Sequence, residues 1–299
     1  MYSTSAILGL LTETSLHAGA GQTLGVIDLP IQREAHTHWP CVYGSAVKGA
    51  LRARAESAEL PDIDLIFGPP PPKAGKSIDH AGALSVGDAR LLLLPVRSLT
   101  THFRWVTCPA ALHRFRRDLA RLGLASAFGA FDIPEPAETE THQATALVTE
   151  AANEGHLFLE EYRFETRTAD LSAIIAALAK LLPDNMEDDL KAQLTLMSND
   201  AFRHLAEYAT PVNAHVRLTD KKTVAPHTLW YEETLPPETL LYVALNAVAA
   251  RGSGAELQAT DVLARIGQDL FGQHPYLQLG GNETVGMGWC RVRFIDGEG

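Results

Sequence analysis

The chain has 299 residues, of which 46% are hydrophobic and 20% are charged, and its formal net charge is -11. This composition predicts a packed core and excludes a disordered chain. No apolar run approaches the roughly 20 residues that cross a bilayer, and the first residues lack the features of a signal peptide. We therefore expect a cytoplasmic protein with no membrane partner.

The cysteines give no sign of metal or redox chemistry. Cys41, Cys108 and Cys290 lie far apart, and the sequence contains no Cys-x-x-Cys pair. Because zinc and redox motifs need such close pairs, we expect buried thiols.

Charge is unevenly distributed along the chain. Between Arg90 and Arg121 there are seven arginines and one acid, whereas nine acids and one arginine lie between Phe131 and Glu165. The acidic total argues against a simple nucleic-acid binder. The arginine run is nevertheless compatible with a local basic groove, and the alternative is a solvated face.

The first third of the chain predicts a strand, a loop and a helix. SAILGLLTET has the apolar density of a buried strand, and the glycines of SLHAGAGQTLGVIDLP predict a loop after it. YGSAVKGALRARAE predicts a helix that Ser45 caps, with a basic side formed by Lys48, Arg52 and Arg54.

The middle of the chain alternates predicted strands and helices. The four prolines of FGPPPPKAGKSIDHAG predict a surface insertion, because they exclude both helix and central strand. ALSVGDARLLLLPVRSL predicts strands and CPAALHRFRRDLARLG an amphipathic helix. Two further strands, near ATALVTE and HLFLEEYRFE, precede helices that end near Tyr208.

The last third predicts a hairpin and then strand, helix, strand. Residues 210–235 alternate apolar and polar residues around the turn TDKKT. LLYVALNAV predicts a strand, DVLARIGQDLFG a helix and MGWCRVRFI a final strand after the glycine-rich GGNETVGMG. This order is the β-α-β-β-α-β plan of an α+β ferredoxin-like domain with a large central insertion.

Four segments together resemble a known family. They are LHAGAGQTLGVIDLPIQRE with GSAVKGALR, the stretch from LPVRSL to LHRFRRDL, the stretch from SNDAFRHLAEYATPVNAHVRL to LWYEETLP, and LQLGGNETVGMGWC. They are similar to the RAMP superfamily and, within it, to the backbone subunits of type III-B (Cmr) CRISPR effectors. The likeness touches both ends and the middle of the chain.

The resemblance implies a fold and a domain organisation. It implies one RAMP domain over residues 1–299, with a ferredoxin-like (RRM-like) palm and a β-hairpin thumb. We expect the palm at about 1–60, 84–130 and 236–299, a Pro-rich insertion at 61–83, and a helical insertion with the thumb at about 165–235.

The resemblance also implies an activity and its partners. The protein would bind guide RNA, assemble with further copies of itself and with other effector subunits, and cleave complementary single-stranded target RNA at regular intervals. The alternatives are a scaffold subunit that binds RNA without cutting it, or a metabolic ferredoxin-like enzyme that binds a phosphate ligand.

The candidate catalytic residue is Asp28, in VIDLPIQRE. The resemblance implies that it lies beside the scissile phosphate, either as a ligand for a weakly held Mg or Mn ion or as a proton acceptor. From the residues alone, a residue that begins a turn before Pro30 is the preferred interpretation of Asp28. His17, Tyr231 and Glu232 are further catalytic candidates, with a polar loop residue and structural acids as the alternatives.

The candidate RNA-binding residues lie in two segments. Ser45, Lys48 and Arg52 share a helix face that offers a hydroxyl and two cations to phosphates, or forms an ordinary solvated face. Close backbone approach to RNA is expected at Gly280, Gly281, Asn282, Gly286 and Gly288. The alternative for this segment is a tight hairpin with ordinary turn glycines.

The four tryptophans can serve RNA binding or the core. Aromatic rings stack on unpaired bases, but core packing is the commoner role of tryptophan. The residues concerned are Trp39, Trp105, Trp230 and Trp289.

Overall fold

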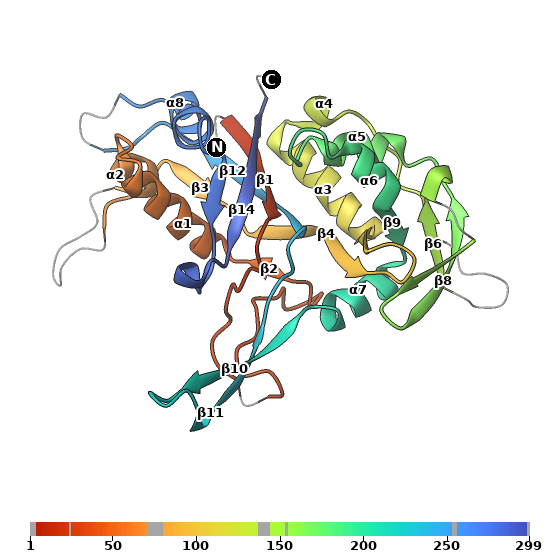
Figure 1. Ribbon diagram of the computed structural model, residues 1–299. Helices are drawn as coiled ribbons and strands as arrows, with labels where there is room; N and C mark the ends of the chain where they lie inside the picture. The colour runs from red at the N-terminus through yellow and green to blue at the C-terminus, as the bar shows by residue number, and fades with distance from the viewer. Residues whose placement is uncertain are drawn as a thin grey trace.

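The computed structural model describes residues 4–23, 25–70, 80–136, 144–152, 155–252 and 256–297. Part of the Pro-rich insertion expected at 61–83, residues 71–79, lies outside these ranges. Figure 1 shows a central sheet with helices on both sides and a hairpin that leaves the body.

The predicted α+β ferredoxin-like plan is confirmed. Four neighbouring strands run in the order β14-β1-β12-β4, and every adjacent pair is antiparallel. In chain order, the core elements are β1 (Thr4–Thr12), α1 (Gly44–Ser57), β4 (Ala89–Arg97), β12 (Leu240–Ala247), α8 (Ala259–Ala264) and β14 (Trp289–Asp296).

The sheet continues beyond this core on both sides. Beyond β4, the added strands are β5 (Phe103–Thr107), β9 (Leu194–Met197), β6 (Thr145–Val148), β8 (Tyr162–Thr168) and β7 (His156–Leu159), in that spatial order. Beside β14 lies β13 (Tyr276–Gln278), while β2 (Cys41–Val42) pairs with β4 and β3 (Leu84–Val86) pairs with β12.

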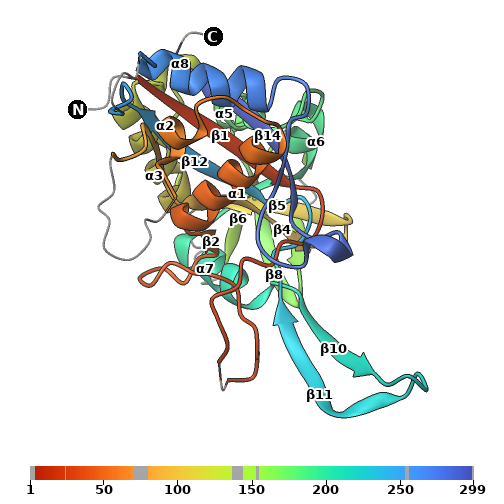
Figure 2. The ribbon, with the colours of Figure 1, turned by 90° about the vertical axis from the view of Figure 1, so that its left-hand side faces the viewer.

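Helices cover both faces of the core strands, as Figures 1 and 2 show. On one face lie α1, α2 (Ile63–Phe67) and α8, which continues as a π-helical turn, η2 (Arg265–Leu270). On the other lie α3 (Pro109–Leu122), α4 (Ala125–Phe128), α5 (Ser172–Ala179) and α6 (Glu187–Gln193). The remaining α-helix, α7 (Asn199–Tyr208), leads into the hairpin.

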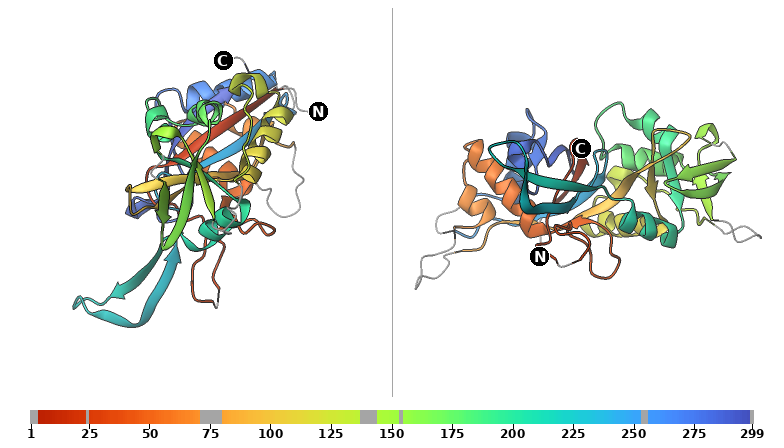
Figure 3. Two further views of the ribbon diagram at one scale, coloured as in Figure 1. Left: turned by 90° about the vertical axis from the view of Figure 1, so that its right-hand side faces the viewer. Right: turned by 60° about the horizontal axis from the view of Figure 1, so that its bottom comes forward.

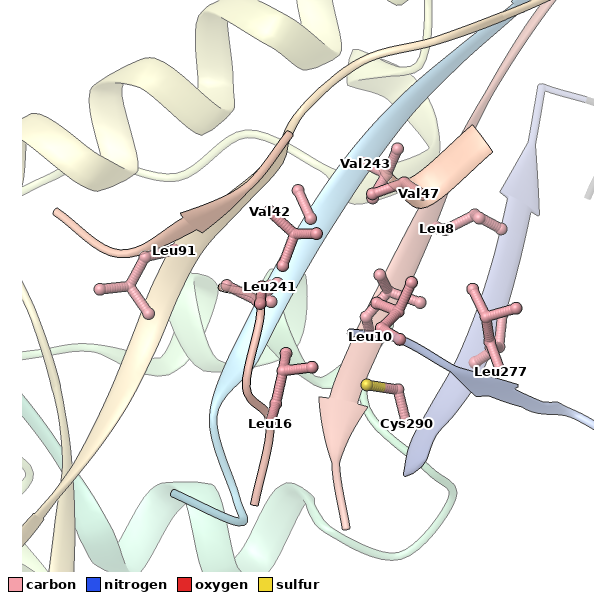
Figure 4. Packing of buried hydrophobic residues seen from close by; sticks show 14 of the residues in the cluster. Leu8, Leu10, Leu16, Val42, Val47, Leu91, Leu241, Val243, Leu277 and Cys290 are labelled. Carbon is pink, nitrogen blue, oxygen red and sulfur yellow. The ribbon is translucent and has the colours of Figure 1, made fainter. Parts of the chain in front are cut away.

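β1 is the strand on which the two layers meet. Its side chains alternate, so that Leu8 and Leu10 join the cluster under α1 while Ile7 joins the cluster under α3. Figure 4 shows the first of these clusters. Gly9 faces the backbone of Leu181 so closely that a Cβ atom would collide with it, which explains a glycine in mid-strand.

The start of α1 differs from the prediction. Ser45 does not cap the helix, because the helix begins at Gly44, one residue earlier, and its N-cap is Tyr43. The Gly44 amide instead donates to the Asp88 carboxylate over 2.7 Å. The Asp88 side chain, between β3 and β4, thus accepts a hydrogen bond from an amide at the start of α1, which is the role expected of Ser45.

The cysteines are buried, as predicted. Cys41, Cys108 and Cys290 are all free thiols with little or no contact with solvent. Burial raises the pKa of each to about 12, so these thiols stay protonated and unreactive at neutral pH.

The hairpin forms its own two-stranded sheet. β10 (Val212–Leu218) and β11 (Val224–Glu233) pair with each other, and they project well beyond the body in Figure 2 and in the left panel of Figure 3. In the described part of the chain, no helix has both the length and the apolar composition needed to cross a membrane.

Leu8→Ala tests the contribution of the doubly covered strand. Leu8 is 0% exposed, so we expect its truncation to lower the free energy of unfolding by about 2–5 kcal/mol. Leu99→Ala makes the same chemical change at a residue that is 71% exposed, and it should change stability by less than about 0.5 kcal/mol. Denaturant unfolding measures both, and equal losses would contradict this account of the core.

Candidate functional site

Two segments that are distant in sequence meet at the base of the hairpin. The amides and carbonyls of Leu16 and Leu235 exchange two hydrogen bonds, of 2.9 and 2.8 Å. Leu29 accepts from the Glu233 amide and donates to the Tyr231 carbonyl, each over 3.0 Å. The loop at 15–30 is therefore fixed to the end of β11, beside the hairpin in Figures 2 and 3.

Asp28 is held by the hairpin through one carboxylate oxygen. Its Oδ2 accepts a hydrogen bond from the Tyr231 amide over 2.8 Å. Its Oδ1 has no hydrogen-bond partner among the residues described, and the side chain is half-buried. Asp28 is thus more than a turn residue, since it presents one carboxylate oxygen in a fixed position.

The His17 ring is fixed by the same strand end. Its Nδ1 lies 2.7 Å from the carbonyl oxygen of Glu233. A carbonyl only accepts, so Nδ1 carries the proton and, in the neutral ring, Nε2 is a hydrogen-bond acceptor. A Cβ atom on Gly19 would lie 2.9 Å from Nε2, and glycine there keeps this nitrogen uncovered.

Tyr231 and Glu232 have different surroundings. Tyr231 is exposed, whereas Glu232 is buried. Glu232 Oε1 accepts a hydrogen bond from Asn282 Nδ2 over 2.7 Å. Glu232 therefore connects the hairpin to the glycine-rich segment, 280–288.

The glycine-rich segment is an exposed loop between β13 and β14, longer than a tight hairpin turn. The Gly281 amide donates to the His17 carbonyl over 2.9 Å. The amides of Asn282, Glu283 and Thr284 have no acceptor within the described ranges. Successive unpaired amides of this kind suit an anion such as phosphate.

The predicted cationic face of α1 is partly engaged within the protein. Lys48 Nζ donates to the Leu84 carbonyl over 3.0 Å, and burial, with a contribution from Arg52, lowers the pKa of this amine. Arg52 pairs with Glu56 and Asp64, at 2.7 and 2.8 Å. Ser45 is exposed.

A groove joins α1 to the glycine-rich segment on a different side of the helix. Its volume is about 510 Å³, and it is lined from α1 by Arg54 and from the other wall by Glu283 and Trp289. Trp289 is 40% exposed. Ser45, Lys48 and Arg52 are not among its lining residues.

The arginine run from Arg90 to Arg121 is mostly paired inside the protein, which argues against a basic groove. Arg90 and Arg121 contact Asp118, Arg114 contacts Glu34, and Arg97 contacts Glu160. Arg104 is buried and donates to carbonyls.

The tryptophans divide between the core and the surface. Trp39 and Trp105 are buried, and Trp39 packs edge-on against Phe202. Trp230 stacks on His215 within the hairpin. Of the four, Trp230 and Trp289 are the ones that retain solvent-exposed surface for stacking.

The residues present give a divalent ion little protein ligation. Among the described residues, no three His, Cys, Asp or Glu side chains gather closely enough to hold a metal. Asp28 Oδ1 supplies one hard oxygen of the kind that Mg and Mn prefer. The site fits an ion whose other ligands are water and phosphate oxygens.

The sequence profile of the RAMP superfamily matches residues 10–291. The chain belongs to the RAMP superfamily. It is 37% identical over 294 residues to the CRISPR system Cmr endoribonuclease Cmr4 of Pyrococcus furiosus, covering 96% of this chain and 94% of that protein. The CRISPR system CMR subunit Cmr4 of Saccharolobus solfataricus is 22% identical, over 95% of this chain and 94% of that protein.

Solved structures show the same RAMP fold. Oligomeric Cmr4 from Pyrococcus furiosus superposes with a TM-score of 0.73 at 31% identity, over 99% of both chains. A chain of the type III-B Cmr-beta complex bound to cognate target RNA gives a TM-score of 0.72 at 20% identity, over 98% of both chains.

The sequence predicts neither of two further residues of this RAMP site as a catalytic or RNA-binding residue, although Glu233 belongs to the candidate acid cluster of WYEE. Glu233 and Arg33 form an ion pair of 2.5 Å next to Asp28 and His17. The acid pair in WYEE drew attention to Glu232, but no local signal separates it from Glu233. Contacts with Arg33 and Ile31, 200 and 202 residues away, distinguish Glu233.

Gly280→Ala tests whether the glycine-rich segment of this RAMP protein must rest on the His17 backbone. At φ 77°, an alanine Cβ would collide with the His17 carbonyl oxygen, whereas Gly286, at φ 84°, faces open space. Gly286→Ala should lower the free energy of unfolding by about 1–2 kcal/mol, because alanine is strained at this φ. Gly280→Ala should lower it by more. Denaturant unfolding compares the two, and an equal loss would count against the close contact.

Proposed function

We propose that this chain is the guide-RNA-binding backbone subunit of a type III-B CRISPR effector and cleaves complementary target RNA. The observation that carries the proposal is Asp28, a half-buried carboxylate that the hairpin fixes through one oxygen, while the other has no partner among the residues described. Support also comes from the relative that is 37% identical and named an endoribonuclease. Its partners are guide RNA, target RNA, other effector subunits and further copies of itself, and its place is the cytoplasm.

Guide RNA binding rests on backbone amides more than on net charge. The amides of Asn282, Glu283 and Thr284 can donate to phosphate although the chain carries a charge of -11. Gly281 lets the RNA backbone approach, Gly280 lets the loop rest on the His17 backbone, and exposed Ser45 adds a hydroxyl. Gly286 and Gly288, both at positive φ, shape the same loop. Lys48 and Arg52 contribute positive potential while bonded to their own chain.

Cleavage requires the ribose 2′-oxygen to lie in line with the leaving 5′-oxygen, which a stacked helix does not permit. The hairpin is the element that would displace a nucleotide next to Asp28, because its base carries the Asp28 contact. Holding reacting atoms in this geometry supplies part of the rate enhancement.

Asp28 and His17 are the groups placed to act on the reacting atoms. His17 Nε2 is the open ring nitrogen, and it can accept or return a proton while Nδ1 stays bonded to Glu233. Tyr231 is exposed next to Asp28, and buried Glu232 holds Asn282. A divalent ion on Asp28 Oδ1 would stabilise negative charge that develops on the phosphate oxygens.

Asp28→Asn tests the catalytic assignment. Asparagine retains an oxygen for the Tyr231 amide but removes the charge, so the loop should keep its position. We expect complexes assembled with guide RNA and partner subunits to bind target normally and to cleave it at least about 100-fold more slowly.

The control is Asp200→Asn, which makes the same change in an acid whose side chain is 95% exposed. It should leave cleavage at evenly spaced sites unchanged. Undiminished cleavage by Asp28→Asn would instead favour a scaffold role for this chain, with another subunit as the nuclease.

Chelation tests the metal. If Asp28 works through an ion held mainly by RNA and water, removal of divalent cations with EDTA should stop cleavage, and added Mg or Mn should restore it. Cleavage products are measured on denaturing gels. Full activity in EDTA would assign Asp28 to proton transfer without a metal.

A further inference from the structure

Glu233 is the most heavily bonded carboxylate near the candidate site. It is the last residue of β11 and is 2% exposed. Its Oε1 accepts from Arg33 Nη2 and from Thr210 Oγ1, at 2.5 and 2.6 Å. Its Oε2 accepts from the Ile31 amide over 3.0 Å. Three donors from two different segments thus converge on one side chain.

The backbone of the same residue holds the two candidate catalytic groups. The Glu233 amide donates to the carbonyl of Leu29, which directly follows Asp28, and the Glu233 carbonyl accepts from His17 Nδ1. A displacement of Glu233 would therefore move the backbone next to Asp28 and release the His17 ring. No other residue among those described is bonded to both places.

Arg33 extends the contacts to the helix before the hairpin. Its Nη1 donates to the carbonyls of His38 and Ala206, at 2.7 and 2.8 Å. The guanidinium thus links the segment that follows Asp28 to α7 through Nη1, and to Glu233 through Nη2. Because a guanidinium is a rigid planar fork, these contacts fix relative orientation as well as distance.

We propose that the Arg33–Glu233 pair is the positioning element that holds Asp28 and His17 in one fixed arrangement relative to the hairpin. The proposal rests on the proposed function. Neither residue touches the reacting atoms, and each acts through Asp28 and His17. A buried ion pair is weak evidence for stability in itself, so its value here lies in the segments that it joins.

Glu233→Gln is the sharpest test because it keeps the size of the side chain. All three of its partners are donors, and an amide has a single oxygen, so at least one donor must face the new NH₂ group. In effector complexes assembled with guide RNA and partner subunits, we expect a 10- to 100-fold slower single-turnover cleavage, since small misplacements carry losses of about this size. Target affinity should change less than about threefold.

The matched control is Asp118→Asn. Asp118 is also a buried carboxylate with three donors, from Arg90, Tyr242 and Arg121, but these lie on α3 and the core strands. Its loss should lower stability without slowing cleavage. If Glu233→Gln does not assemble, Arg33→Lys is measured instead, since lysine keeps the charge and loses the fork.

Hydrogen exchange of the assembled complexes provides a readout that does not depend on activity. Peptides covering 25–33 should exchange faster in Glu233→Gln than in the unmodified complex, and their exchange should be unchanged in Asp118→Asn. For Glu233→Gln, unchanged hydrogen exchange or unchanged cleavage would overturn the positioning role, and so would a parallel fall of cleavage and target affinity. An equal loss of cleavage in Asp118→Asn would also overturn it. Asp28→Asn, measured in the same experiment, separates the proposed function from the positioning role. If this variant still cleaves target RNA, the proposed function is overturned, while hydrogen exchange of Glu233→Gln still decides the positioning role.

Discussion

β1 is buried on both faces, and this constraint determines where the candidate site forms. It is covered by α1 and α8 on one face and by α3 and α5 on the other, and in the sheet it lies between β12 and β14. Because both pairs are antiparallel, the end of β1 meets the beginnings of the other two, with Leu11 opposite Leu240 and Thr12 opposite Cys290. The loop after β1, the hairpin before β12 and the glycine-rich segment before β14 therefore converge at one edge.

The same geometry reconciles an acidic chain with RNA binding. Most arginines between Arg90 and Arg121 neutralise acids or satisfy carbonyls within the fold. Where the loops converge, the glycine-rich segment exposes backbone amides that can donate hydrogen bonds, in place of surplus cationic side chains. Amides keep their donors regardless of net charge, so the proposed phosphate binding would depend on the shape of the loop, which the glycines and the contact with His17 maintain.

The core strands and helices could be predicted from the sequence because the patterns that indicate them are local. The apolar density of β1 and the apolar face of α3 both depend on neighbouring residues, and both predictions are confirmed. Asp28 was singled out by its resemblance to a motif. The helix start at Gly44 and the Arg33–Glu233 pair were missed because their partners are 44 and 200 residues away. Such contacts exist only after the sheet has brought distant segments together.

Among the described residues, the hydrogen bonds that attach the hairpin to the body lie at its base. In this part of the chain, β10 and β11 pair with each other and with no strand of the large sheet. Adding two residues to each strand would carry the tip outward by about 7 Å, at roughly 3.4 Å per residue, and would leave every contact at Glu233 in place. Reach and folding stability can therefore change independently, so relatives of this chain can vary the length of the ribbon without rebuilding the core.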